Sequence, residues 1–242
     1  MRLKATIAYN GSKFFGFQRQ KNNYTTVSET IELALYSLGI KNRVYGSGRT
    51  DRGVHASGQV IHFDIPNFWQ NKTLNTLKEA LNSKLDFIKI LHLKEVSSAF
   101  HAQYSAKLRV YRYIIKRVPP TIFEKEFVSY YKINNTDAMM QALQLYRGKH
   151  NFSFFKKEGS PTTSNIRTIQ KIKCAELHQY FIVYFFADGY LRSQVRMMLE
   201  GALKVANSEL TLLELQEQIE QKKRYFTTLA KPEGLYLHKV IY

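Results

Sequence analysis

The first half of the chain mixes two kinds of apolar pattern. Residues 2–9 and 87–96 are apolar at about every second position, which predicts strands because successive side chains of a strand point to opposite faces. Residues 26–38 and 72–84 are apolar at steps of three or four, which predicts helices. Thr26 and Glu29 have the spacing of a capping box. With two further strands around residues 43–45 and 59–63, this half reads β-α-β-β-α-β.

The second half shows a comparable mixture. Strand patterns cover residues 107–116, 167–177, 180–187 and 233–241, and the middle two predict a hairpin. Helix patterns cover residues 136–146 and 191–202, and a last helix follows the capping-box pair Thr211 and Glu214. We therefore expect an α+β protein with two halves, residues 1–104 and 105–242, whose mostly antiparallel sheets can join.

A glycine-rich loop separates the two central strands of the first half. Four glycines fall between Gly46 and Gly58, and a single acid, Asp51, lies between Arg49 and Arg52. A carboxylate on such a loop, held between strands, is how a nucleophile or general base is presented. The alternative is an Asx turn, in which the Asp51 side chain bonds the backbone near Gly53; local chemistry alone favours that turn.

The composition narrows the class of protein. Hydrophobic residues make up 44% of the 242 residues, which excludes a disordered chain. The 36 Lys and Arg outnumber the 19 Asp and Glu, giving a net charge of +17, so we expect a polyanion partner, with nucleic acid first. The basic residues are spread along the chain, which disfavours a membrane surface, and the strongest apolar run, residues 180–187, is too short to span a bilayer. The N-terminus lacks a signal-peptide pattern, and the single Cys174 fits a reducing cytoplasm.

The loop at residues 13–21 combines three basic residues with three phenylalanines. This composition is typical of segments that contact phosphates and stack bases. Phe14, Phe15 and Phe17 can equally anchor a long loop to the core. The sequence leaves both interpretations open.

The sequence lacks the motifs of several other kinds of catalytic and binding site. The seven histidines are scattered and show no ligand spacing with Cys or acids, so we expect no metal. Phosphate-binding glycine motifs and a nucleophile elbow are missing as well. A metal-dependent nuclease would usually show several carboxylates. An RNA enzyme that uses one carboxylate and no cofactor fits what remains.

Residues 48–56 closely resemble the catalytic motif of tRNA pseudouridine synthases of the TruA type. Further matches follow in chain order along nearly the whole length: residues 9–12 with 16–20, 100–102 with 109–113, 195–198, and 232–237. Each short match is weak, but five in the right order are specific. The resemblance implies the pseudouridine synthase fold, with one extended sheet, helices on one side and an active-site cleft between the halves.

The resemblance also implies the reaction. Uridines at positions 38, 39 and 40 of the tRNA anticodon stem-loop become pseudouridine, with Asp51 as the nucleophile. Arg196 pairs with Asp51, and Tyr111 stacks on the uracil and takes its C5 proton. Without the resemblance, Arg196 reads as an exposed helix residue and Tyr111 as a core tyrosine. The residues that it implies for substrate binding are Arg49, Thr50, Tyr111, Leu235, Arg19, Gln20 and Arg109. It further implies a cytoplasmic homodimer without metal or organic cofactor.

The chain departs from the family pattern at a few positions. The family usually has Asp where this chain has Asn10, Trp where it has Phe17 and a small residue where it has Arg52. With Glu200 inserted, the segment from Arg196 to Gly201 is one residue longer than the family pattern has it. A non-catalytic tRNA-binding or chaperone module of the same fold is the alternative function. The intact Asp51 and Tyr111 disfavour it, because a binder needs basic and aromatic groups but no carboxylate facing phosphates.

Overall fold

The computed structural model describes residues 1–20, 24–70, 72–159 and 162–242. The chain forms two compact units. Unit 1 comprises residues 1–107 together with residues 236–242, and unit 2 comprises residues 108–235. The last strand of the chain therefore belongs with its first residues, a pairing that the order of elements along the sequence does not reveal.

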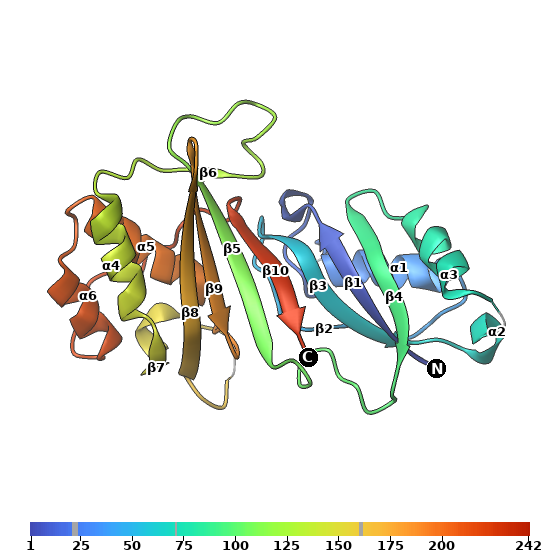
Figure 1. Cartoon of the computed structure of the whole chain (residues 1–242). Coiled ribbons are helices and arrows are strands. Elements are labelled where there is room, and N and C mark those ends of the chain that lie inside the picture. The colour runs from blue at the N-terminus through green and yellow to red at the C-terminus, as the bar shows by residue number, and fades with distance from the viewer. Residues whose placement is uncertain (21–23, 71, 160–161) are drawn as a thin grey trace. The chain divides into compact units, whose positions relative to one another are not determined.

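Unit 1 is built on an antiparallel sheet with one parallel neighbour. The central strand β1 (Arg2–Tyr9) pairs antiparallel with β3 (His55–Asp64) and with β4 (Ile88–Val96), and Figure 1 shows the three side by side. The short β2 (Tyr45–Gly46) pairs antiparallel with β3, and β10 (Leu235–Ile241) pairs parallel with it. Alternate side chains of β1 are buried, as the period of two predicts. The helical segments of this unit are η1 (Gly11–Lys13), α1 (Val27–Ser37), α2 (Asn67–Gln70) and α3 (Leu74–Asn82).

Unit 2 has a second antiparallel sheet. Its strands β5 (Leu108–Lys116), β9 (Tyr180–Ala187), β8 (Ile166–Leu177) and β7 (Gly148–Asn151) pair in that order (Figure 1). The short β6 (Ser129–Tyr130) runs parallel to β5. The helices α4 (Thr136–Leu145), α5 (Gln194–Ala206) and α6 (Leu212–Ile219) pack against one another, and η2 (Ser153–Phe155) packs against α5 and α6.

The expected α+β class with mostly antiparallel sheets is confirmed. The predicted hairpin at residues 167–187 is confirmed as β8 and β9. The joining of the halves into one sheet with a cleft between them concerns how the units are arranged and stays a prediction.

The two predicted capping boxes have opposite outcomes. At α6, Thr211 and Glu214 bond each other's backbone N–H groups, which confirms the capping box predicted there. At α1, the Thr26 side chain caps nothing, so that prediction is wrong. The reason lies in the preceding loop, because the carbonyls of Gly16 and Phe17 accept hydrogen bonds from the first two N–H groups of the helix. These groups need no side-chain partner.

Candidate active site

The loop that carries Asp51 is held by a buried residue beside it. Thr50 is 6% exposed, and its hydroxyl lies 2.8 Å from the hydroxyl of Tyr9 on β1. The Thr50 carbonyl accepts a hydrogen bond of 3.1 Å from the backbone N–H of Phe17. Side chain and backbone of Thr50 are thus tied to two other segments, which fixes the position of the next residue, Asp51.

A buried glutamine supports the start of the same loop. Gln59 on β3 is fully buried, and its amide donates to the carbonyl of Gly48 at 2.7 Å. Its oxygen accepts a hydrogen bond of 2.6 Å from Ser47 and one of 3.1 Å from the Val60 N–H. Buried polar groups with all partners satisfied hold a single geometry. We did not predict a role for Gln59 from the sequence, although a glutamine amid the apolar pattern of a strand was a usable signal.

The turn at Asp51 is closed by the backbone itself. The N–H of Val54 donates to the Asp51 carbonyl at 3.1 Å, and Gly53 has φ of +79°, a conformation that favours glycine. Asp51 is half-exposed, and Arg49 and Arg52 on either side are exposed. The turn and the presentation of a carboxylate are therefore compatible, because the backbone makes the turn and Asp51 stays half-exposed.

A close backbone approach locks the far end of the loop. A side chain at Gly11 would lie 2.0 Å from the Val54 carbonyl, so only glycine fits there. The N–H of Gly11 donates to Nδ1 of His55 at 3.0 Å. The His55 ring in turn stacks on Tyr236 of β10, with centroids 4.7 Å apart. The loop is thereby connected to η1 and to the final strand of unit 1.

Tyr111 lies on β5 of unit 2 and is 7% exposed. Its ring meets the ring of Tyr190 edge to face, with centroids 5.0 Å apart. The Tyr190 hydroxyl is buried without a hydrogen-bond partner among the described residues, and burial raises its pKa well above the usual value. Tyr190 was missed by the sequence analysis. An aromatic residue in a loop before a helix carries no signal that it packs on a strand far away in sequence.

The two arginines predicted in unit 2 are held by backbone carbonyls. Arg109 donates from Nη1 to the Asp188 carbonyl at 2.7 Å, and Arg196 donates from Nε to the Ala230 carbonyl at 2.6 Å. Arg196 lies in the first turn of α5, which begins at Gln194. Arg192 precedes this helix and binds the Glu158 carbonyl at 2.9 Å instead. Ser193, with φ of +59°, separates it from the helix that we expected to carry both.

Leu235 begins β10 and is 4% exposed. The preceding Gly234 donates to the Ser129 hydroxyl at 3.0 Å and accepts from the Ile114 N–H at 2.9 Å. A side chain at Gly234 would meet the Tyr113 ring at 2.6 Å. Glycine at this position lets the chain approach β5, and this contact fixes where Leu235 lies within unit 2.

Arg19 and Gln20, predicted to bind substrate, make contacts within unit 1. Arg19 lies 3.2 Å from a carboxylate oxygen of Glu29 and 3.6 Å from one of Glu32, and its side chain is 56% exposed. The Gln20 amide donates to the Phe15 carbonyl at 2.6 Å. Their role toward a substrate stays a prediction.

The sequence left open whether the phenylalanines of this loop anchor it to the core or are available to stack on bases. Phe14 and Phe17 are each 4% exposed and anchor the loop to the core. Phe15 is only half-buried, and its ring stacks on Tyr24. The third basic residue of the predicted segment, Lys21, lies outside the described residues.

Three of the departures from the family pattern have local roles. Asn10 accepts hydrogen bonds from the N–H and hydroxyl of Ser12 at 3.1 and 2.9 Å, which begins η1. Phe17 fills the space over Gly46, where an added side chain would lie 2.4 Å from its ring. Glu200 accepts a hydrogen bond of 3.2 Å from Thr228, so its carboxylate is satisfied at the surface of α5.

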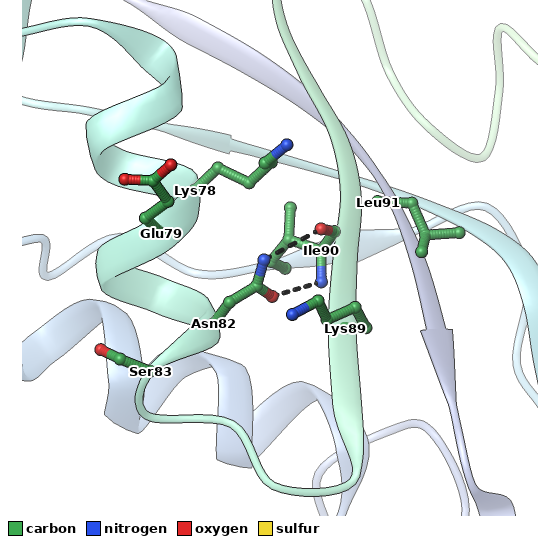
Figure 2. Close-up of a pocket in the computed structure, with 7 residues that line it drawn as sticks. All are labelled: Lys78, Glu79, Asn82, Ser83, Lys89, Ile90 and Leu91. Carbon is green, nitrogen blue, oxygen red and sulfur yellow. Dashed lines mark hydrogen bonds between the residues drawn. The ribbon is translucent and has the colours of Figure 1, made fainter.

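A surface hollow of about 520 Å³ lies between α3 and β4, away from the Asp51 loop. Figure 2 shows its lining, with Asn82 reaching from α3 across to β4. The Asn82 amide donates to the Ile90 carbonyl at 3.1 Å and accepts from the Ile90 N–H at 2.8 Å. Since both polar groups of Asn82 are used to join helix and strand, we assign this hollow a structural role.

Two kinds of site were sought in the described residues: a cluster of metal-ligating side chains and a membrane-spanning helix. No three His, Cys, Asp or Glu side chains among them gather as ligands of a metal ion would. Of the helices in this part of the chain, none has the length and apolarity to cross a membrane.

Comparison with known proteins gives a consistent result. The family model described as tRNA pseudouridine synthase matches residues 5–105 and 142–242. The chain is 42% identical to "tRNA pseudouridine synthase A" of Helicobacter hepaticus, over 99% of this chain and 98% of that protein. Proteins of the same name from Helicobacter pylori and Wolinella succinogenes are 38% and 36% identical, over 99% and 98% of this chain and 99% and 93% of theirs. The chain therefore belongs to the tRNA pseudouridine synthase family.

Proposed function

We propose that this chain isomerises uridines of the tRNA anticodon stem-loop, at positions 38, 39 and 40, with Asp51 as the nucleophile. In this reaction the N1–C1′ glycosidic bond breaks, the uracil rotates, and its C5 bonds to the ribose C1′. C5 then loses its proton and N1 gains one, so substrate and product are isomers. The family relationship carries the class of reaction. The choice of Asp51 rests on its position in the matching motif and on the geometry of its loop.

The observation that carries the proposal is the contrast between Asp51 and the residue before it, Thr50. Thr50 is buried and bonded on both sides, whereas Asp51, the next residue, is half-exposed. A nucleophile needs this combination, because a fixed backbone lowers the entropy lost on reaching the reacting atom. The carboxylate can serve three routes: attack on the sugar C1′, attack on the base, or removal of a C2′ proton.

We further propose roles for two residues of unit 2. Tyr111 stacks on the extruded uracil and takes the C5 proton, and Arg196 supplies a positive charge that pairs with the Asp51 carboxylate. Arg196 suits this task because the Ala230 carbonyl fixes its guanidinium. Arg49, Thr50, Leu235, Arg19, Gln20 and Arg109 remain the proposed substrate-binding residues.

The direct test is chemical mapping of pseudouridine in an unmodified tRNA transcript incubated with the wild-type protein and with Asp51→Asn, without added metal. We expect pseudouridine at positions 38–40 with the wild type and none with the variant, because an amide cannot act as the nucleophile. Binding of the tRNA should stay within a few-fold. The matched control is Asp86→Asn, which alters an exposed carboxylate elsewhere in unit 1 and should leave the product unchanged.

Each other outcome has a clear meaning. Product from Asp51→Asn would remove Asp51 as the nucleophile. Pseudouridine at other tRNA positions would overturn the choice of the anticodon stem-loop while keeping the reaction. Tight binding without product from the wild type would favour the non-catalytic binding module. The cytoplasmic homodimer belongs to the same proposal, and light scattering on the purified protein would test the dimer.

A further inference from the structure

Three side chains of unit 1 form a cation–aromatic stack that the proposed reaction does not use. The rings of Phe15 and Tyr24 stack with centroids 4.3 Å apart and planes inclined by 11°. The guanidinium carbon of Arg52 lies 4.2 Å from the centroid of the Phe15 ring. We refer to these residues as the Arg52–Phe15–Tyr24 stack.

The stack lies beside the reactive loop. Arg52 directly follows Asp51, so their Cα atoms are about 3.8 Å apart. The segment that carries Phe15 also touches this loop, because Phe17 donates to the Thr50 carbonyl at 3.1 Å. Gly16 packs so closely that an added side chain would lie 2.9 Å from the same carbonyl.

Backbone hydrogen bonds tie the segment of Phe15 to its neighbours, while the outer groups of the stack are accessible. The backbone N–H of Phe15 donates to the Thr25 carbonyl at 2.9 Å, which joins the segments that carry the two stacked rings. Tyr24 is 42% exposed and Arg52 is exposed. Among the described residues, no hydrogen bond or ion pair engages the Tyr24 hydroxyl or the Arg52 guanidinium. A rigid aromatic face and an unpaired cation are therefore presented together next to Asp51.

We propose that the Arg52–Phe15–Tyr24 stack binds a nucleotide of the substrate RNA that neighbours the target uridine. The exposed face of Tyr24 stacks on its base, and Arg52 contacts its phosphate. Stacking accepts any base because every base has a π-face, and a guanidinium presents a fork of donors to a phosphate. This inference rests on the proposed function and adds a second contact point beside the catalytic one.

A purely structural role, in which the stack only braces the loop, makes a different prediction. Loosening the brace would disturb the position of Asp51 and lower kcat. Loss of a base contact would instead weaken binding and raise KM with little change in kcat. The two roles can therefore be separated by measuring both constants.

The first test compares Tyr24→Ala and Tyr24→Phe with a matched control, Tyr36→Ala. Tyr36 on α1 is also a surface tyrosine of unit 1, 61% exposed, with the Lys41 amine 5.8 Å from its ring centroid. We expect Tyr24→Ala to raise the Kd for an unmodified tRNA transcript by about tenfold, the range of one lost base stack. Tyr24→Phe should restore binding because stacking needs only the ring, and Tyr36→Ala should bind like the wild type.

The second test measures the phosphate contact through its salt dependence. Arg52→Ala should make the slope of log Kd against log salt shallower by about 0.7–1, the effect of one lost phosphate contact, whereas Arg52→Lys should keep the slope. Thermal unfolding of each variant reports whether the fold is retained.

The proposal is overturned if Tyr24→Ala binds like the wild type, if Tyr36→Ala weakens binding equally, or if Tyr24→Ala lowers kcat alone. Failure of the proposed function is distinguishable from these results. It would appear as wild-type protein that makes no pseudouridine, while the binding measurements on the stack stand independently.

Discussion

Single contacts decide how the reactive loop is presented. Gly11 must lack a side chain to approach Val54, and Thr50 must be buried for its hydroxyl to meet Tyr9. None of these residues is proposed as the nucleophile, acid or base, although Thr50 is also a proposed substrate-binding residue. Their role is to fix the backbone on either side of Asp51.

The proposed proton transfer at Tyr111 can be tested by removing one oxygen. Tyr111→Phe keeps the ring and its edge-to-face contact with Tyr190, so stacking and stability should persist. We expect tRNA binding within about twofold and a product-forming step slowed by about 100-fold, as for loss of a general acid–base group. Single-turnover kinetics measure this step. Turnover equal to the wild type would remove Tyr111 from the acid–base chemistry.

His62 gives the fold a defined pH dependence. It is 2% exposed, and burial, followed by the nearby charges of His101 and Arg2, lowers its pKa from 6.5 to about 4. Between these values the unfolded chain binds a proton that the folded chain excludes. The stability contribution is therefore present above pH 6.5 and is lost as the pH falls toward 4, by up to about 3 kcal/mol.

Urea unfolding at pH 7 and pH 4.5 measures this loss. His62→Gln can still accept the Ala102 N–H that His62 accepts at 3.1 Å, but it cannot titrate. We expect the free energy of unfolding of the variant to fall by about 2 kcal/mol less than that of the wild type over this range. An equal fall in both proteins would contradict the assignment to His62.

At the scale of elements, the same capping pattern has two different outcomes. Thr211 caps α6, since its hydroxyl accepts from the Glu214 N–H and the Glu214 carboxylate accepts from the Thr211 N–H. Thr26 does not cap α1, because the loop at residues 16–17 already supplies carbonyls. A local pattern thus predicts a cap only where no other segment reaches the helix end.

This difference has a measurable consequence. Thr211→Ala removes a cap and should lower the free energy of unfolding by about 1 kcal/mol. Thr26→Val replaces a buried hydroxyl that has no hydrogen-bond partner among the described residues by a methyl group of the same size, so it should leave stability unchanged or raise it. Chemical denaturation of both variants gives the comparison. A larger loss for Thr26→Val than for Thr211→Ala would show that the Thr26 hydroxyl has a partner in solution.

At the scale of the whole molecule, the most informative property is the net charge, because it bears on binding to RNA. With 36 basic against 19 acidic residues, the net charge of +17 favours contacts to phosphates, which release counterions from RNA. Such contacts suit A-form RNA, whose narrow major groove excludes side chains and which proteins recognise by shape.

Salt should therefore weaken tRNA binding steeply. Raising KCl from 50 to 200 mM should increase the Kd for an unmodified tRNA transcript by about 100-fold, as roughly four phosphate contacts would. Filter binding at several salt concentrations gives the slope. A Kd that is flat over this range would mean that the basic residues do not contact the RNA backbone.

The sequence by itself determined the α+β class, most strands and helices, and the Asp51 loop, because these follow from local periodicity, glycine placement and motif order. Only the tertiary structure decided which residues meet from distant parts of the chain. In unit 1, Tyr9 bonds Thr50, Gln59 bonds the Gly48 carbonyl and Tyr24 stacks on Phe15; in unit 2, Tyr190 packs against Tyr111. The two residues of each pair are not separated by a helix or strand repeat, so no periodic pattern in the sequence relates them. Their contacts depend on how strands and loops pack in space, which a local pattern does not encode.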